Sequence, residues 1–189
     1  MAQGLCLICA GNRLAGMSGH HLRKLMIMRH AKSDWPLGVE DHERPLAKRG
    51  HNEAPMIGRW MVKHHHVPDF ILCSSALRTR QTCTWVCHEL GEKAPTPLLS
   101  DALYDATATE VLSEINQLPD TITSLLVISH MPAVQDLAMR LASVESDEEA
   151  VMDMASHYPT SGLTVLEHGK SWAELDGRDA KVTAFVVRR

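Results

Sequence analysis

The sequence predicts an α/β protein built as a three-layer α/β/α sandwich around a mainly parallel sheet. Short apolar runs alternate with longer segments of helical periodicity along most of the chain. Strands and helices that alternate in this way place helices on both faces of a mainly parallel sheet. The length of 189 residues, of which 44% are hydrophobic and 22% charged, suits one domain with a sizeable core of its own.

Five segments are expected to form strands. Four of them are short apolar runs of the kind that strands buried on both faces show. The fifth is rich in β-branched residues, which favour strands. In chain order the five segments cover residues 25–29, 70–73, 125–129, 163–167 and 182–187.

Four segments between these runs carry apolar residues at helical spacing and are expected to form helices. In the first of them Ala54, Ile57 and Met61 lie on a common side. The four segments cover residues 46–64, 77–90, 107–118 and 131–141. The acidic run 145–149 is expected to form a surface loop or the start of a further helix.

We expect residues 1–23 to form an irregular N-terminal extension and residues 24–189 to form the domain itself. The extension contains four glycines, and its apolar run at residues 5–10 is far shorter than the roughly 20 residues of a membrane span. The net charge of −4 argues against a general nucleic-acid binder and against a polybasic membrane patch. We therefore expect no nucleic-acid or membrane partner, and we take a monomer as the simplest assembly.

Five cysteines are an odd number without the dense spacing of a disulfide framework. In a chain of this length they indicate reduced thiols and a cytoplasmic location. Cys6 and Cys9 form a CxxC pair without a second pair at zinc-ribbon spacing, and Cys83 and Cys87 are expected to share one helix face. Both pairs are interpreted as structural or incidental, because free cysteine behaves as a small buried hydrophobe.

Cationic and imidazole side chains follow three of the expected strands at the points where those strands end. Arg29 and His30 lie at the end of the first strand, Arg78 lies in the first turn of the helix after the second, and His130 follows the third. In open α/β sheets ligands bind beyond the carboxyl ends of the strands. We therefore expect two guanidinium groups and two imidazoles to meet at one edge of the sheet.

This set of side chains suits a phosphoryl group. Arginine carries a permanent positive charge on a planar fork that matches phosphate oxygens. Two of the three strand ends also open helices, whose free N–H groups and dipole favour anions. Because no carboxylate-rich metal cage accompanies these residues in the sequence, the pattern indicates a phosphoryl site that uses neither a metal nor a cofactor.

Four stretches of the chain match a known pattern in the correct order between about Leu25 and Leu141. They are MRHAKS (28–33), DHERPLAKRG (41–50), SSALRTRQT (74–82) and VISHMP (127–132). Together they resemble the histidine phosphatase superfamily, and in particular its short phosphohistidine phosphatase (SixA-type) branch. The chain departs from the superfamily pattern at Ala31, where glycine is commoner, and at Thr79, where alanine is usual.

The resemblance implies a phosphoglycerate mutase-like fold and a phosphoric monoester hydrolase of the phosphohistidine phosphatase type. It implies that His30 attacks phosphorus and forms a phosphohistidine intermediate, which water then hydrolyses. Arg29, Arg78 and His130 would hold the phosphoryl oxygens, and Ser33 would add a hydroxyl bond to phosphate unless it lies in a solvated loop. The expected partner is a phosphorylated protein or a small phosphorylated metabolite, and no metal or cofactor is implied.

Asp105 decides between two substrate classes. The stretch Leu103-Tyr104-Asp105 resembles the position of the superfamily's acid, with Asp in place of Glu. Asp105 is either the general acid or a cap of the helix expected at 107–118. An acid here favours small phosphate esters, whereas phosphohistidine needs none because its ring carries its own proton. A non-catalytic phosphate-binding module is the remaining hypothesis.

Overall fold

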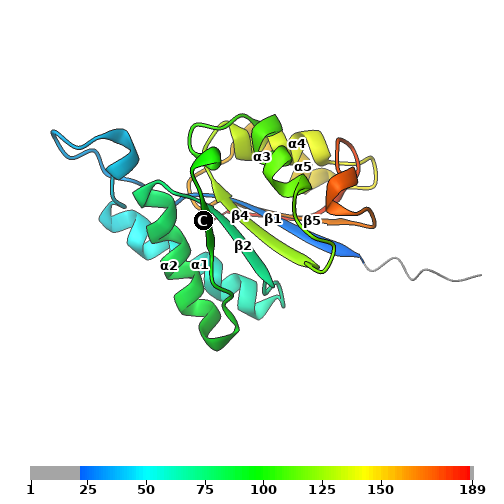
Figure 1. The fold of residues 1–189 in the computed structure, drawn as a ribbon, viewed down its shortest axis with the longest axis horizontal. Coiled ribbons are helices and arrows are strands. Elements are labelled where there is room, and N and C mark those ends of the chain that lie inside the picture. The colour runs from blue at the N-terminus through cyan, green and yellow to red at the C-terminus, as the bar shows by residue number, and fades with distance from the viewer. Residues whose placement is uncertain (1–21, 188–189) are drawn as a thin grey trace, which may run out of the picture.

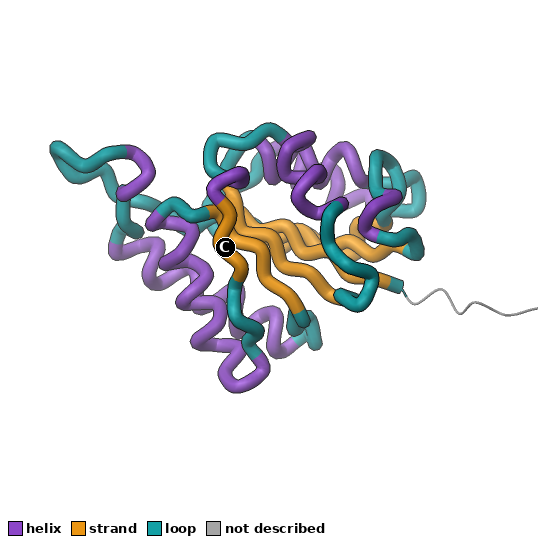
Figure 2. The backbone as a smooth tube through the Cα atoms, viewed as in Figure 1, coloured by secondary structure: helices purple, strands orange, loops and turns teal. Residues whose placement is uncertain are grey.

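The structure is a computed structural model that describes residues 22–187. Within this range six strands form one sheet in the order β3-β2-β4-β1-β5-β6, and five α-helices surround it (Figures 1 and 2). The strands are β1 (Arg23–Arg29), β2 (Phe70–Ser74), β3 (Leu98–Ser100), β4 (Ser124–Ser129), β5 (Leu163–His168) and β6 (Lys181–Val186). The helices are α1 (Lys48–Lys63), α2 (Leu77–Leu90), α3 (Ala108–Asn116), α4 (Ala133–Leu141) and α5 (Glu148–Ser156).

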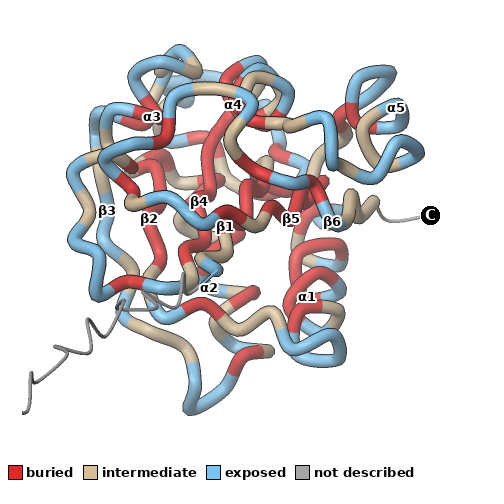
Figure 3. The backbone as a smooth tube through the Cα atoms, turned by 90° about the vertical axis from the view of Figure 1, so that its right-hand side faces the viewer, coloured by how far each residue is buried: buried red, intermediate tan, exposed pale blue. Residues whose placement is uncertain are grey.

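Helices cover both faces of the sheet, as the sequence predicts. Figure 1 shows α1 and α2 on one face and α3, α4 and α5 on the other. The alternation of side chains along each strand builds a separate core on each side. In β1, Met26 and Met28 pack with residues of α1 and α2, while Leu25 and Ile27 pack with residues of α3 and α4. Burial is concentrated in the central strands and the inner faces of the helices (Figure 3).

The sheet is mainly parallel on one side and antiparallel on the other. Pairs β1–β4, β2–β4 and β2–β3 are parallel, whereas β1–β5 and β5–β6 are antiparallel. The carboxyl ends of β1, β2 and β4, three adjacent strands, consequently meet at the same edge. This arrangement confirms the predicted α/β sandwich and places the residues after these strands side by side.

The sequence does not predict strand β3, and it predicts only the start of helix α5. Strand β3 has only three residues, and both of its leucines are about half exposed, so it lacks the longer apolar run by which the other strands were found. Helix α5 was expected only as a possible helix start in the acidic run 145–149, and this alternative is the correct one: α5 begins at Glu148 within the run, and the Asp147 side chain caps it by accepting a hydrogen bond from the Ala150 N–H. The predicted helix 46–64 begins later, at Lys48, because Leu46 instead forms a β-bridge with Ser33.

Most of the expected N-terminal extension, including Cys6 and Cys9, lies outside the described residues. Within its expected span, Arg23 is already the first residue of β1. No helix among residues 22–187 has the length and apolar character needed to cross a membrane.

Gly50, in the first turns of α1, touches the chain just beyond His30. A Cβ atom at this position would overlap the backbone carbonyl of Lys32, two residues after His30. In an open helix Gly→Ala gains up to about 1 kcal/mol, but here the overlap forces backbone movement and we expect Gly50→Ala to lower the free energy of unfolding by about 1–3 kcal/mol. Urea denaturation measures the change.

Gly177 provides the matched control for this substitution. A Cβ there would meet its nearest neighbour, the Arg140 carbonyl oxygen, at an ordinary 3.5 Å. We expect Gly177→Ala to change stability by no more than about 0.5 kcal/mol. Equal effects of the two substitutions would show that the approach of α1 to Lys32 does not matter.

Candidate active site

The structure brings Arg29, His30, Arg78 and His130 together at the edge of the sheet. Strands β1 and β4 pair in register with Arg29 opposite Ser129, so His30 and His130 follow the two strands at the same level. Their ring centroids are 5.2 Å apart. The positive charges of Arg78 and Arg29 lower the pKa of both imidazoles. The expected meeting of two guanidinium groups and two imidazoles is therefore observed.

His30 is held as a neutral imidazole of one tautomer. His30 is 8% exposed, and its ring Nδ1 lies 2.7 Å from the carbonyl oxygen of Ala31. Because a carbonyl only accepts, Nδ1 carries the proton and the lone pair is on Nε2. Burial, together with the neighbouring His130, Arg78 and Arg29, lowers the pKa of His30 to about 3, although the Ala31 carbonyl opposes this. At neutral pH the His30 ring is thus uncharged, and its Nε2 carries a free lone pair.

His130 lies beside His30 and has one ring nitrogen without a partner. Its Nε2 is 2.8 Å from the Ser74 hydroxyl at the end of β2. Its Nδ1 is buried and makes no hydrogen bond within residues 22–187. Burial and the charge of Arg78 lower the pKa of His130 to about 4, so this ring is neutral as well. An incoming group can satisfy its free nitrogen.

The Arg29 guanidinium donates one hydrogen bond from Nη1, while its buried Nε has no hydrogen-bond partner in the described part of the chain. Its Nη1 donates to the carbonyl oxygen of Tyr158 at 2.8 Å. The Tyr158 hydroxyl in turn donates to the Ile27 carbonyl oxygen at 2.8 Å, and this tyrosine is 1% exposed. The Arg29 Nε is buried without a partner in the described part of the chain. Buried donors of this kind are rare, and an anion at the strand ends would supply the missing acceptor.

Arg78 contacts a carboxylate that the sequence analysis did not assign to the site. Its Nη1 donates to the Asp41 carbonyl oxygen at 2.6 Å and its Nη2 to Asp41 Oδ2 at 3.0 Å. Arg44 Nη1 donates to Asp41 Oδ1 and the Tyr104 hydroxyl to Asp41 Oδ2, both at 2.8 Å. The hydrogen bond from Arg44 has the largest effect, and together these donors hold the pKa of Asp41 well below its usual range, so the carboxylate stays charged.

The sequence contains Asp41 and Arg44 in the matched stretch 41–50, but no local pattern indicates their roles. The Asp41–Arg78 contact spans 37 positions and depends on how the loop after β1 folds back over α2. The role of Tyr104 is equally hidden in the sequence. Tyr104 precedes Asp105, but only the fold shows that its hydroxyl donates to Asp41.

Ser33 is buried, not part of a solvated loop. It is 8% exposed, and its Oγ accepts a hydrogen bond of 2.8 Å from Arg44 Nη2. The solvated alternative for this residue is therefore wrong. The hydroxyl hydrogen of Ser33 remains available as a donor.

Asp105 lines a cavity of about 350 Å³ together with Arg78 and His130. Its backbone has a positive φ of 55°. It does not cap α3, because Thr107 does so in a capping box with Glu110. The helix-cap interpretation of Asp105 is therefore wrong. His30 and Arg29 are not among the residues that line the cavity.

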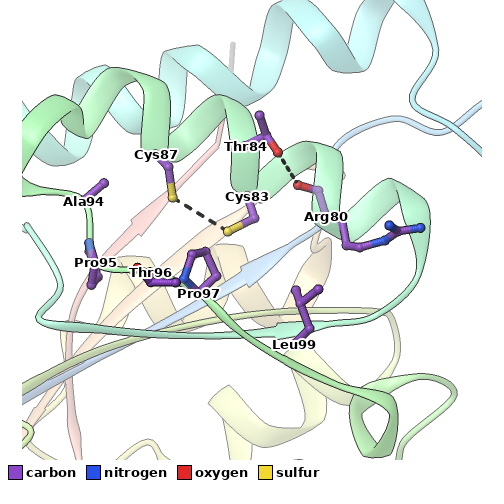
Figure 4. Close-up of a pocket in the computed structure, with 9 residues that line it drawn as sticks. All are labelled: Arg80, Cys83, Thr84, Cys87, Ala94, Pro95, Thr96, Pro97 and Leu99. Atoms are coloured by element: carbon purple, nitrogen blue, oxygen red, sulfur yellow. Dashed lines mark hydrogen bonds between the residues drawn. The ribbon is translucent and has the colours of Figure 1, made fainter.

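Cys83 and Cys87 lie on one face of α2, as predicted, with their sulfur atoms 3.8 Å apart. Figure 4 shows both thiols at a groove of about 590 Å³ that the loop before β3 closes on the other side. A hydrogen bond with Cys73 and burial raise the pKa of the Cys83 thiol, although its bond with Cys87 opposes this, and the bond with Cys83 and burial raise the pKa of the Cys87 thiol. The groove is larger than the cavity at the strand ends but contains none of the predicted site residues.

Two histidines and two arginines at the ends of parallel strands in an α/β sandwich are the arrangement that the sequence predicts for a histidine phosphatase. The family model of the histidine phosphatase superfamily (branch 1) matches residues 25–172. The chain therefore belongs to the histidine phosphatase superfamily, and it is a phosphatase by that membership. An uncharacterised protein of Mycobacterium tuberculosis is 40% identical over 163 residues, which are 86% of this chain and 100% of that protein.

Solved structures place the chain near the SixA-type branch with its phosphoglycerate mutase-like fold. A protein from Nakamurella multipartitia, assigned to the phosphohistidine phosphatases SixA, aligns with a TM-score of 0.77 and 27% identity over 88% of this chain and 96% of that one. A protein from Agrobacterium tumefaciens with the same assignment aligns with a TM-score of 0.72 and 25% identity over 88% and 98% of the two chains. The resemblance of the four sequence stretches to this branch is thereby confirmed.

Proposed function

We propose that this phosphatase hydrolyses phosphohistidine on a protein, through a covalent intermediate on His30. The observation that carries the proposal is the state of His30: a buried, neutral ring whose Nδ1 proton is held by the Ala31 carbonyl and whose Nε2 lone pair is left for attack. Two guanidinium groups and a second imidazole surround it. These are the groups that a transferring phosphoryl needs.

In the first step the His30 Nε2 lone pair forms a bond to phosphorus while the bond from phosphorus to the substrate's ring nitrogen breaks. The substrate ring carries a proton on its other nitrogen, so it leaves as neutral imidazole and needs no external acid. Arg29 Nε and the Arg78 guanidinium neutralise the equatorial oxygens. His130 adds an Nδ1–H donor when the Ser74 hydroxyl donates to its Nε2.

In the second step water attacks the phosphorus atom of phosphorylated His30. The bond from phosphorus to Nε2 breaks, the ring returns to its neutral form with its proton still on Nδ1, and the attacking water loses a proton to solvent. The Ala31 carbonyl holds the Nδ1 proton throughout the cycle. Orthophosphate and the original enzyme result.

A protein substrate is supported by the loop between β1 and the short 3-10 helix Asp41–Glu43. This loop projects from the body of the molecule (Figure 1). Trp35 and Leu37 on it are 71% and 102% exposed. The Arg44 guanidinium lies over the Trp35 ring, 3.2 Å from its centroid, so the apolar loop is linked to the site. Exposed apolar groups of this kind are typical of surfaces that contact another protein.

A second candidate function, hydrolysis of small phosphate esters, is favoured by one observation. Asp105 lines the same cavity as Arg78 and His130 and is available as a general acid. An alkoxide leaves poorly without a proton, so an ester needs such an acid where phosphohistidine does not.

Wild-type enzyme and Asp105→Asn, assayed with a strong chelator present, test both functions. We expect the wild type to dephosphorylate a histidine-phosphorylated protein and the variant to keep that activity within about threefold. On an alkyl phosphate ester the variant should lose about 10²–10⁴ in rate, the share that general acid catalysis supplies. Asp101→Asn is the control, because Asp101 is exposed and does not line the cavity.

Each other outcome has a definite meaning. Ester hydrolysis without turnover of phosphohistidine would replace the first function by the second. Equal losses on both substrates in Asp105→Asn would contradict the expectation that only ester hydrolysis needs Asp105. Tight binding of vanadate without turnover of any substrate would identify a non-catalytic phosphate-binding module.

A further inference from the structure

We propose that the cavity beside Arg78 and His130 receives the leaving group and that Asp136, with Asp105, selects substrates whose leaving-group portion is cationic while it is bonded to phosphorus over substrates in which it is negatively charged. The inference deepens the proposed function and rests on its assignment of His30 as the nucleophile. It adds Asp136 as a specificity-determining residue and states the charge of the group that the site accepts.

The position of the cavity identifies it as the leaving-group side. Arg78 and His130 line it, whereas His30 does not, although the His30 ring lies 5.2 Å from that of His130. Phosphoryl transfer places the attacking and leaving atoms roughly in line on opposite sides of phosphorus. A phosphoryl group held by Arg78 and His130 and attacked by His30 therefore directs its leaving group away from His30 and into the cavity.

The charges that line the cavity are predominantly negative. Three carboxylates, Asp41, Asp105 and Asp136, face one cation, Arg78. The Asp41 carboxylate is already matched by Arg44 and Arg78. Within residues 22–187, Asp105 and Asp136 form no ion pair. Two uncompensated carboxylates thus surround the space for the leaving group.

Asp136 also has an ordinary structural explanation, which is separable from this one. It lies in the first turn of α4, where an acidic side chain stabilises the helix dipole. Glu149 occupies the equivalent first turn of α5 and does not line the cavity. Comparison of the two residues therefore distinguishes a helix effect from an effect on the substrate.

The chemistry of phosphohistidine matches this negative surface. Its ring is cationic in the form that departs readily, because the nitrogen away from phosphorus is protonated. Carboxylates at the cavity wall stabilise this form, whereas a leaving group with its own carboxylate, as in a phosphoglycerate, meets repulsion. The apolar side chains of Met131 and Pro132 complete the wall and suit a flat ring.

Inhibition by two alkyl phosphates of opposite leaving-group charge tests the inference. Phosphocholine carries a quaternary ammonium and 3-phosphoglycerate a carboxylate. Their inhibition constants are measured against phosphoramidate or p-nitrophenyl phosphate, whichever the wild type hydrolyses. We expect wild type to bind phosphocholine more tightly than 3-phosphoglycerate, and Asp136→Asn to reduce this preference by about two- to fivefold, as expected for one exposed charge. The effect should shrink as salt rises.

Glu149→Gln is the matched control and should leave the preference unchanged. An unaltered preference in Asp136→Asn, or an equal change in Glu149→Gln, would overturn the inference. The readout does not require activity on phosphohistidine. If that activity is missing but the preference and its loss in Asp136→Asn are found, the proposed protein substrate is wrong and the leaving-group assignment stands. If phosphohistidine is hydrolysed but Asp136→Asn does not change the preference, the role of Asp136 is wrong and the proposed phosphohistidine phosphatase activity stands.

Discussion

His30→Ala is expected to abolish turnover, with a loss of at least about 10⁴-fold, as removal of a covalent nucleophile causes in other hydrolases. His30 supplies the only bond from the enzyme to phosphorus in the proposed reaction, and no neighbouring side chain can replace its geometry: His130 is turned to Ser74. The measurement is the rate on a phosphorylated substrate under single-turnover conditions.

A trapping experiment connects this loss to the covalent step. Wild-type enzyme mixed with labelled substrate and quenched early in alkali should carry a phosphate that is stable in base and released in acid, and peptide mapping should place it on His30. His30→Ala should carry none. His88→Ala, at an exposed position on α2, should label like the wild type. Wild-type enzyme that turns over without label on His30 would show the covalent mechanism to be wrong.

Arg78→Lys is expected to lower the rate by about 10²–10³, the range for removal of one oxyanion donor. Lysine keeps the positive charge but loses the planar fork, and Arg78 uses that fork in the structure to reach Asp41 through two nitrogens at once. The expected loss therefore separates geometry from charge, and it is measured as kcat/KM on the same substrate.

Arg59→Lys is the control for this substitution. Arg59 lies on α1, where its side chain is 57% exposed and paired with Glu89. We expect no more than a twofold change in rate from this surface pair, consistent with about 0–0.5 kcal/mol. A loss of less than about tenfold in Arg78→Lys would mean that charge alone suffices and that the fork is not used.

Much of the fold was predictable because its strands are unusually clear in the sequence. The strands of the parallel core are continuous apolar runs, and the rule that ligands lie beyond their carboxyl ends predicts the positions of His30 and His130 from the sequence alone. Helix α2 was predicted at its observed ends. Strand β3 was missed because three residues with exposed leucines carry no periodic signal.

The parts of the site that the sequence does not predict are those that depend on long-range packing. Asp41 contacts Arg78 across 37 positions and Tyr104 across 63, and neither separation leaves a trace in local pattern. The interpretation of Asp105 as a cap failed for a different reason: Thr107, two residues later, offers a complete capping box with Glu110 and takes the position. The sequence therefore indicates the arginine and histidine side chains of the site but not the contacts that hold them in place.

The Asp41 carboxylate gives the site a counter-ion of its own. Its oxygens accept from Arg44, Arg78 and Tyr104, so in the proposed cycle the departing orthophosphate exchanges with an anion that the chain carries permanently. The effective concentration of such a tethered group is set by the fold and does not follow the composition of the surrounding buffer. In the proposed cycle, free phosphate would therefore compete with the Asp41 carboxylate for Arg78, and this competition would limit product inhibition.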